Sequence, residues 1–284
     1  MKHLIYLLLL LGTLVPAGCE QRDEPTLNPA DIPLVVEGWI EEGKAPVVMV
    51  THAANLTGNV PSLDSLIEKW CRVIIYDNDV PYILTSRKND AYLPPIIFTS
   101  TRLKGKPGHT YRLTVETDDR TVSATAFMLP APELDSVRVV PVEGNDSLFS
   151  LRAYLYNPER GTYYKYFLKT IPGEQRSYPA FMGNVSADSY NPVEGTSLTR
   201  GRRAALNDST SSEFLHYFKK GDHVLVTCAS LEPEIYDLWR VYDANVSFSD
   251  NIFFTFTSNL PSNIEGGLGY FAAYGATEKA VIVR

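Results

Sequence analysis

The sequence predicts a mainly β fold: an N-terminal Ig-like β-sandwich followed by a second antiparallel β domain that carries one amphipathic helix. The first indication is composition, since 17 Tyr, 12 Phe and 19 Pro among 284 residues favour strands bounded by turns. The second is a series of short apolar runs, about ten residues apart and separated by turn residues, which is typical of a sandwich. The third is one stretch near the C-terminus whose apolar residues recur with a helical period.

A hairpin opens the first predicted domain. The apolar runs 34–40 and 46–52 are joined by the Gly-containing turn 41–44, and two such runs joined by a short turn predict a hairpin. Further strands are expected over residues 71–76, 80–85, 96–101, 110–116 and 121–127. We expect this sandwich to span residues 33–129.

The Pro-rich segment 130–132 predicts a linker. A second, β-rich domain is then expected over residues 133–284. Its expected strands are 134–141, 148–156, 163–171, 222–230, 252–257 and 280–283. The Gly-rich segment 265–269 lacks the following Lys-Ser/Thr of a phosphate loop, so we expect a tight backbone approach inside a sheet there.

One helix is predicted over residues 231–244. Its evidence is a set of apolar residues at positions i, i+4, i+7, i+8 and i+11, which fall on one helical face: Leu231, Ile235, Leu238, Trp239 and Tyr242. Ser230 is the expected N-cap, and Pro233 is acceptable in a first turn.

The N-terminus has the sequence pattern of an export signal. The apolar run Leu4–Leu11 is too short to cross a bilayer, which takes about 20 residues, so it predicts the apolar region of a signal peptide. Gly18-Cys19 resembles a bacterial lipobox, in which the cysteine is acylated and the preceding peptide is removed. We therefore expect a signal peptide over residues 1–18, lipidation at Cys19 and a tether over residues 19–32.

The acidic pair Asp23-Glu24 resembles the surface-export signal of Bacteroidetes lipoproteins. We expect a lipid-anchored outer-membrane protein at the cell surface, with a periplasm-facing position as the alternative. The expected lipid anchor would attach the protein to the membrane, which is therefore its first expected partner. A net charge of −7 disfavours nucleic acid and anionic lipid surfaces as partners.

Catalytic and metal-binding motifs are not found in the sequence. The histidines lack metal-ligand spacing, and there is no Gly-x-Ser-x-Gly elbow. We predict no catalytic residue, no metal and no cofactor, and no enzymatic activity. A hydrolase whose triad or paired carboxylates meet only in the fold is a less favoured alternative.

Tyr164 and Tyr166 are the candidate binding residues. They share a face of the aromatic-rich strand 163–171, and exposed rings stack on sugars or anchor partners. A surface glycan-binding module is therefore the alternative function. Cys71 and Cys228 each lie in an apolar run, so a buried free thiol and a disulfide are both left open.

Four segments, in this order, resemble the uncharacterised Bacteroidetes lipoprotein family DUF4249: residues 35–40, 108–113, 230–239 and 263–271. The resemblance covers nearly the whole mature chain. It implies an outer-membrane lipoprotein, often encoded beside a TonB-dependent outer-membrane receptor, and it brings no catalytic residues. The expected function is thus a non-catalytic accessory protein that binds such a receptor or its nutrient cargo.

Overall fold

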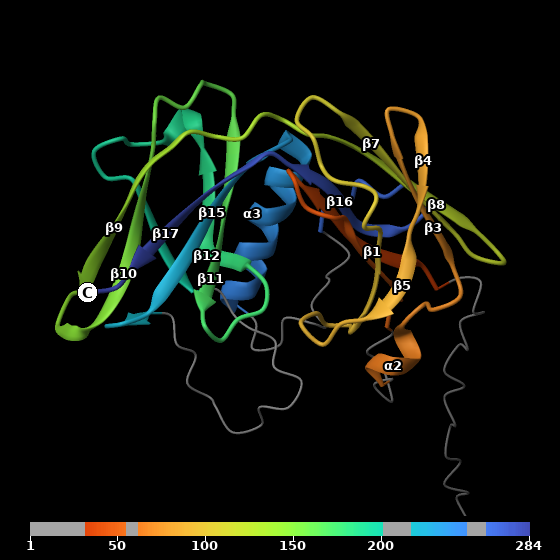
Figure 1. Cartoon of the computed structure of the whole chain (residues 1–284), viewed down its shortest axis with the longest axis horizontal. Helices are drawn as coiled ribbons and strands as arrows, with labels where there is room; N and C mark the ends of the chain where they lie inside the picture. The colour runs from red at the N-terminus through yellow and green to blue at the C-terminus, as the bar shows by residue number, and fades with distance from the viewer. Residues whose placement is uncertain (1–31, 55–61, 201–216, 249–259) are drawn as a thin grey trace, which may run out of the picture. The chain divides into compact units, whose positions relative to one another are not determined.

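The computed structural model describes residues 32–54, 62–200, 217–248 and 260–284 (Figure 1). The described chain is mainly β, as predicted, and residues Ile32–Arg284 form one compact unit. The predicted signal peptide, the tether up to residue 31 and the predicted strand 252–257 lie outside the described residues. No helix in the described ranges is long and apolar enough to cross a membrane.

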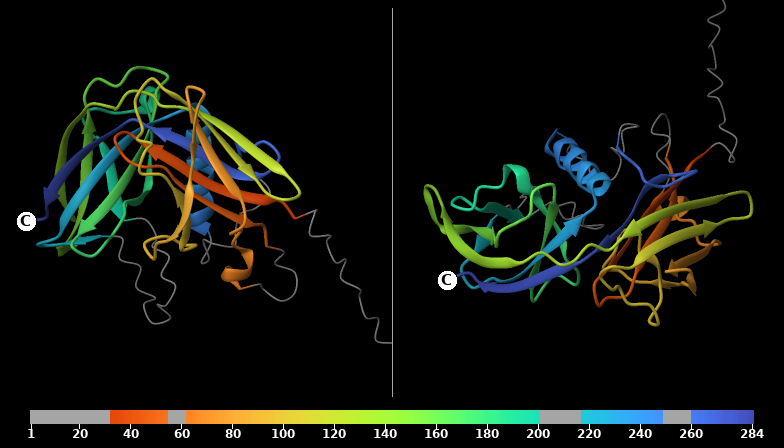
Figure 2. Two further views of the ribbon diagram at one scale, coloured as in Figure 1. Left: turned by 45° about the vertical axis from the view of Figure 1, so that its right-hand side comes forward. Right: turned by 90° about the horizontal axis from the view of Figure 1, so that it is seen from above.

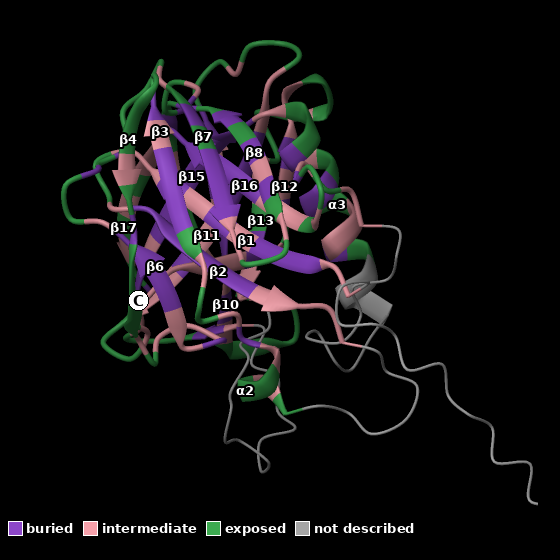
Figure 3. Ribbon diagram, turned by 90° about the vertical axis from the view of Figure 1, so that its right-hand side faces the viewer, coloured by how far each residue is buried: buried purple, intermediate pink, exposed green. Residues whose placement is uncertain are grey.

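Two sheets form the N-terminal sandwich. The first has the strand order β16 (Leu268–Tyr274), β1 (Leu34–Glu41), β2 (Val47–His52), β6 (Ile96–Thr99), β5 (Thr85–Lys88). The second has the order β4 (Val80–Ile83), β3 (Arg72–Asp77), β7 (Thr110–Glu116), β8 (Thr121–Phe127). The short helix α2 (Leu63–Leu66) lies between β2 and β3 in the chain. Strands β3, β7 and β2 carry many buried residues (Figure 3), which pack together between the two sheets.

Strand β1 faces two different environments. Leu34, Val36 and Ile40 are fully buried in the core between the two sheets. The alternate side chains of Glu37 and Trp39 lie on the other face of the same sheet, because successive residues of a strand point in opposite directions. This outer face is the part of the sandwich that builds the site described below.

Strand β16 completes the first sheet from far along the sequence. It runs parallel to β1, with Val36 opposite Gly269 and Gly38 opposite Phe271. Gly269 has a φ of +107°, and a Cβ there would lie 2.0 Å from the Val36 carbonyl oxygen. The tight backbone approach predicted for the Gly-rich segment is therefore confirmed, since only glycine fits at this distance.

The second body is a nearly closed, barrel-like sheet (Figure 2). Its path is β14 (Phe218–Lys219), β10 (Asn145–Leu155), β13 (Thr196–Arg200), β12 (Tyr178–Ser186), β11 (Tyr163–Ile171), β15 (His223–Leu231), β17 (Ala276–Ile282), with β9 (Leu134–Val142) also paired to β10. A short 3-10 helix, η2 (Ala187–Ser189), follows β12. Lys279 Nζ donates to the Leu134 carbonyl at 3.2 Å, which links β17 to β9. Side chains such as Tyr166, Leu168 and Val226 fill the interior.

The predicted helix is present as α3 (Pro233–Phe248), packed beside β11 and β12 (Figure 1). Its N-terminus was predicted wrongly. Leu231 and Ser230 belong to β15, and Ser230 Oγ donates to the Pro130 carbonyl at 2.7 Å instead of capping the helix. The helix therefore begins at Pro233, because the pairing of β15 with β11 extends through Leu231.

Two chain crossings join the sandwich to the barrel-like body. The segment 129–132 passes beside Gly275, where a Cβ would lie 2.0 Å from the Leu129 carbonyl oxygen. Thr277 Oγ1 donates to the Pro132 carbonyl at 2.6 Å. Strands β16 and β17 are consecutive, yet they pair with β1 in one body and with β15 in the other. The predicted domain boundary at residues 129–133 stays a prediction. Residues 268–274, which were expected in the second domain, pair with β1 of the first.

Candidate functional site

A cavity of about 830 Å³ lies between the outer face of the first sheet, the outer face of β11 and β15, and α3. Strands β1, β2 and β16 supply one wall. Phe167 and Lys169 from β11 and Leu225 and Thr227 from β15 supply the facing wall. Ligand pockets in proteins commonly enclose about 300–1,000 Å³, so the cavity has the size of a binding site.

Aromatic rings dominate one side of the cavity. Trp239 of α3 makes edge contacts with Phe167 at 5.9 Å and with Tyr270 at 5.8 Å between ring centroids. Its indole Nε1 donates to the Tyr274 hydroxyl at 3.4 Å. Edge-to-face packing of this kind fixes ring orientation, so the wall is held in place without a ligand.

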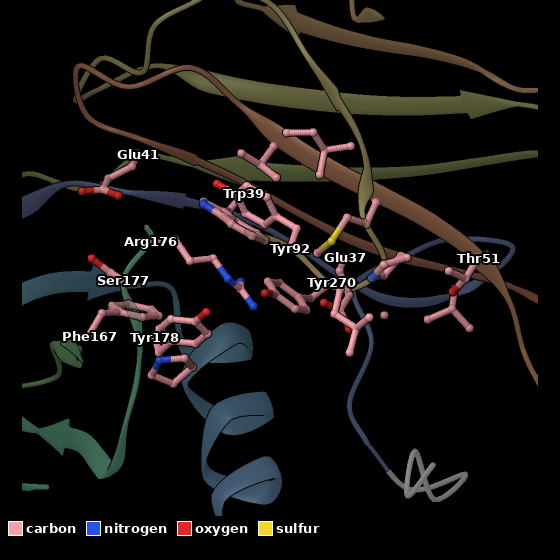
Figure 4. Close-up of a pocket in the computed structure, with 18 of the residues that line it drawn as sticks. Glu37, Trp39, Glu41, Thr51, Tyr92, Phe167, Arg176, Ser177, Tyr178 and Tyr270 are labelled. Carbon is pink, nitrogen blue, oxygen red and sulfur yellow. The ribbon is translucent and has the colours of Figure 1, made fainter. Parts of the chain in front are cut away.

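Arg176 enters the cavity from the connection between β11 and β12. Figure 4 shows its side chain between Trp39 and Tyr92, which belong to the sandwich, and Phe167 and Tyr178, which belong to the barrel-like body. The guanidinium carbon lies 5.0 Å from the Tyr92 ring centroid and 4.5 Å from that of Tyr178.

The guanidinium of Arg176 has no hydrogen-bond or ion-pair partner in the described part of the chain, and its Nε is shielded from solvent. Buried donors without partners are uncommon in native proteins, and each needs an explanation such as an unseen ligand. Contact with the two tyrosine rings stabilises the charge, but it leaves the N–H groups unused.

Glu37 projects into the same cavity from the centre of β1. Burial raises the pKa of its carboxyl, and the nearby positive charge of Arg176 lowers it by less. No ion pair within 4.0 Å or hydrogen bond to Glu37 occurs among the described residues. Burial, together with the neighbouring Tyr274 and the negative charge of Glu37, also raises the pKa of the Tyr270 hydroxyl well above its ordinary value.

A second set of buried charges lies nearby, between α3 and the barrel-like body. Lys165 Nζ donates to Asp243 Oδ2 at 2.9 Å and to the Ala180 carbonyl at 3.3 Å. Asn184 Nδ2 donates to the same Asp243 oxygen at 2.6 Å. Burial lowers the pKa of Lys165 and raises that of Asp243, and the attraction between the two charges opposes both shifts.

The structure places Tyr164 and Tyr166 inside the barrel-like body, where 6% and 0% of each is exposed. Neither ring presents a face to solvent, because the side of β11 that carries both tyrosines points into the barrel-like body. Phe167 and Lys169, which lie on the opposite side of β11, line the cavity instead. The binding role of Tyr164 and Tyr166 depended on exposed rings, and it stays a prediction. Cys19, the predicted lipidation site, lies outside the described residues.

Both described cysteines are free. Cys71 lies beside the sandwich core, and Cys228 is buried inside the barrel-like body. Two of the described histidines each contact one carboxylate: His52 Nε2 lies 3.0 Å from Glu68 Oε2, and His109 Nδ1 lies 2.5 Å from Asp77 Oδ1. In the ranges that the structure covers, no group of three His, Cys, Asp or Glu side chains could hold a metal ion.

Sequence reasoning did not single out the groups that line the cavity. Glu37 and Trp39 were assigned to a strand without a role, although a lone acid within the apolar run 34–40 was a signal. Arg176 gave no signal of its own, because its position depends on how the connection between β11 and β12 is placed against the sandwich.

The sequence was compared with known protein families and with curated proteins. A family model described as "Domain of unknown function (DUF4249)" matches residues 23–280, which confirms the predicted DUF4249 family, whereas the Bacteroidetes lipoprotein part stays a prediction. No curated protein matches the chain.

Proposed function

The chain belongs to the DUF4249 family, and from this premise and the cavity we propose that it is a non-catalytic binding protein. In this proposal a lipid on Cys19 anchors it to the outer membrane, facing the cell surface. It serves a TonB-dependent transport system as an accessory protein, and a small nutrient molecule occupies the cavity. The support from the described residues is a preformed space of about 830 Å³ lined by aromatic rings and by charged groups without partners.

A neutral fluorescent probe tests whether the cavity binds small molecules. N-phenyl-1-naphthylamine brightens in apolar surroundings, so titration of the mature chain should give a saturable increase. Ser177→Trp places a ring in the cavity and should abolish the increase. Ser147→Trp, at an exposed position near the start of β10, is the matched control and should leave it unchanged. Equal binding by both variants would contradict the proposal.

The anchor and the partner need separate experiments in cells. Cys19→Ala should move the protein from the membrane fraction to the soluble fraction, because about 0.8 kcal/mol per buried methylene is lost with the acyl chains. Cross-linking on intact cells, followed by purification, should recover a TonB-dependent receptor. Recovery of no outer-membrane receptor would argue against the accessory role.

A glycan-binding module is the second candidate. The observation that favours it is the pair Trp39 and Tyr92, with ring centroids 6.1 Å apart at the cavity wall, because aromatic rings can stack on sugar faces. Calorimetry with neutral oligosaccharides, repeated on Trp39→Ala, tests it. Binding that depends on Trp39 would favour this candidate over the small-molecule ligand.

A further inference from the structure

We infer that the ligand of this cavity carries a carboxylate, which Arg176 binds through its N–H groups, and a flat apolar body, which packs among the aromatic rings. This inference rests on the proposed function and names the chemistry of its ligand. Four features of the cavity carry it: the guanidinium, the balance of charge, the position of Glu37 and the aromatic walls.

The first feature is how Arg176 is held. Two tyrosine rings, Tyr92 and Tyr178, contact the guanidinium, and the described residues offer no acceptor for its N–H groups. A guanidinium held by aromatic rings keeps its planar fork of donors available, and this fork matches the two oxygens of a carboxylate. The side chain is therefore positioned for an anion that the described protein does not supply.

The second feature is the balance of charge. Lys44 Nζ lies 2.5 Å from Glu41 Oε1 and 2.6 Å from Glu278 Oε1, so one cation is shared by two carboxylates and the three groups together keep one negative charge. The lining charges left without an ion pair in the described ranges are one carboxylate and three cations: Glu37, Arg87, Lys169 and Arg176. With Lys44, Glu41 and Glu278 included, the lining has four cations and three carboxylates, and this net positive charge favours an anionic ligand.

The third feature is Glu37, which orients the ligand. Its carboxylate repels a second negative charge and attracts a hydrogen-bond donor. A carboxylate-bearing ligand therefore places its acid group toward Arg176 and away from Glu37. A hydroxyl or amino group on the ligand would suit the Glu37 end.

The fourth feature is the aromatic wall. Trp39, Trp239 and Tyr270 line the cavity, and Trp239 is fixed by its contacts with its neighbours. Rigid rings gain most from a flat partner, because offset stacking and edge contacts need a planar face. The volume of about 830 Å³ admits a ligand of one or two fused rings with substituents.

A matched pair of probes tests the inference. Naphthalene-2-carboxylate and naphthalene-2-carboxamide have nearly the same shape and differ in charge. Each is titrated against the mature chain loaded with N-phenyl-1-naphthylamine. We expect the carboxylate to displace the dye at a concentration at least about tenfold lower than the amide, since a hydrogen bond to a charged group adds this much affinity. Equal displacement by the two probes would overturn the inference.

Variants assign the preference to Arg176. Arg176→Gln should remove the preference for the carboxylate and leave amide binding within about twofold, because the aromatic walls remain. Arg176→Lys should restore part of the preference, since it keeps the charge but loses the fork. Arg138→Gln is the matched control, because Arg138 lies over the Tyr154 ring outside the cavity, and it should behave like the wild type. An undiminished preference in Arg176→Gln would refute the assignment.

The probes also separate this inference from the proposed function. Dye binding that Ser177→Trp abolishes, combined with equal displacement by both naphthalenes, would retain the binding function and reject the carboxylate. Dye binding that Ser177→Trp leaves intact would reject the cavity itself. A third arm uses Gly-Gly-Trp and its C-terminal amide. Preference for the free acid of this peptide would extend the ligand class to peptide C-termini, and preference limited to the naphthalene pair would restrict it to free small molecules.

Discussion

Two pairs of opposite charges lie inside this molecule, and they are satisfied in different ways. Lys165 and Asp243 form a closed pair, with direct hydrogen bonds to each other and to Asn184. Arg176 and Glu37 form an open pair: both face the cavity, and each influences the other only through its charge. The closed pair joins a helix to a sheet, whereas the open pair lines the cavity.

The difference teaches which charges serve the fold and which serve a ligand. A buried ion pair is tolerated when its hydrogen bonds are complete, and removing one partner is strongly destabilising. A charge that keeps unused hydrogen-bonding groups is a stability cost in the free protein. Such a cost is common where a protein binds something. The following predictions test this distinction, from the largest expected effect to the smallest.

Breaking the closed pair should have the largest effect. Asp243→Ala leaves Lys165 buried with no carboxylate partner, and we expect a loss of about 3–5 kcal/mol in the free energy of unfolding. Urea denaturation measures it. The double variant Lys165→Met/Asp243→Leu should recover most of the loss, because no charge is then buried alone. A loss below about 1 kcal/mol in the single variant would show that the pair contributes little to the stability of the fold.

Breaking the open pair should change stability little. Arg176→Gln removes a guanidinium that contacts two tyrosine rings, and we expect a change within about 1 kcal/mol in the ligand-free protein. The same urea titration provides the comparison with Asp243→Ala. A loss as large as that of Asp243→Ala would mean that Arg176 is structural, and the contrast between the pairs would disappear.

Removing the other charge of the open pair should stabilise the free protein slightly. Burial raises the folded-state pKa of Glu37 above its ordinary value of 4.5, so the fold favours the neutral carboxyl. The stability that this preference provides is present below the unfolded pKa and is lost as the pH rises through the folded pKa. Glu37→Gln should therefore raise the melting temperature at pH 7.

The gain from Glu37→Gln should shrink as the pH is lowered toward 4. Thermal unfolding across this range, in parallel with the wild type, checks it. A gain that does not depend on pH would show that the charge of Glu37 is not the cause.

Alkylation of Cys228 tests whether the barrel-like body stays closed, and we expect almost no labelling of the native protein. Burial raises the pKa of the Cys228 thiol to about 12, with a smaller opposing effect from Tyr166. Because the thiolate is the reactive form, alkylation of the native protein at pH 8 should spare Cys228. In urea the same thiol should react readily. Rapid labelling of native Cys228 would show that the barrel-like body opens in the native protein.

Most of the strands could be predicted because their local patterns are strong. Strand β7 alternates exposed and buried residues over Thr110–Leu113, and the turn before it contains Gly108 at a φ of +78°. The face of α3 that carries Ile235, Leu238 and Trp239 is buried, as its period predicts. The start of α3 could not be predicted, because Leu231 satisfies both the helical period and a strand that pairs with β11.

The site was beyond the sequence for a different reason. Its walls are two outer sheet faces and one helix, and no local pattern states which faces will meet. Tyr164 and Tyr166 illustrate the difficulty. The sequence predicts the aromatic strand, but alternation alone does not say which of its two sides faces solvent. Only the placement of the hairpin that carries Arg176 against the sandwich brings its guanidinium into the same space as Glu37.

The parallel pairing of β1 with β16 has a consequence for biogenesis. The first strand of the body must wait for a partner more than 200 positions later in the chain, and contacts of such long range form slowly. The edge of β1 therefore stays unpaired until almost the whole polypeptide is present. An unpaired edge of this kind can pair with the edge of another chain, so the unfinished sheet is open to association that the completed sheet avoids.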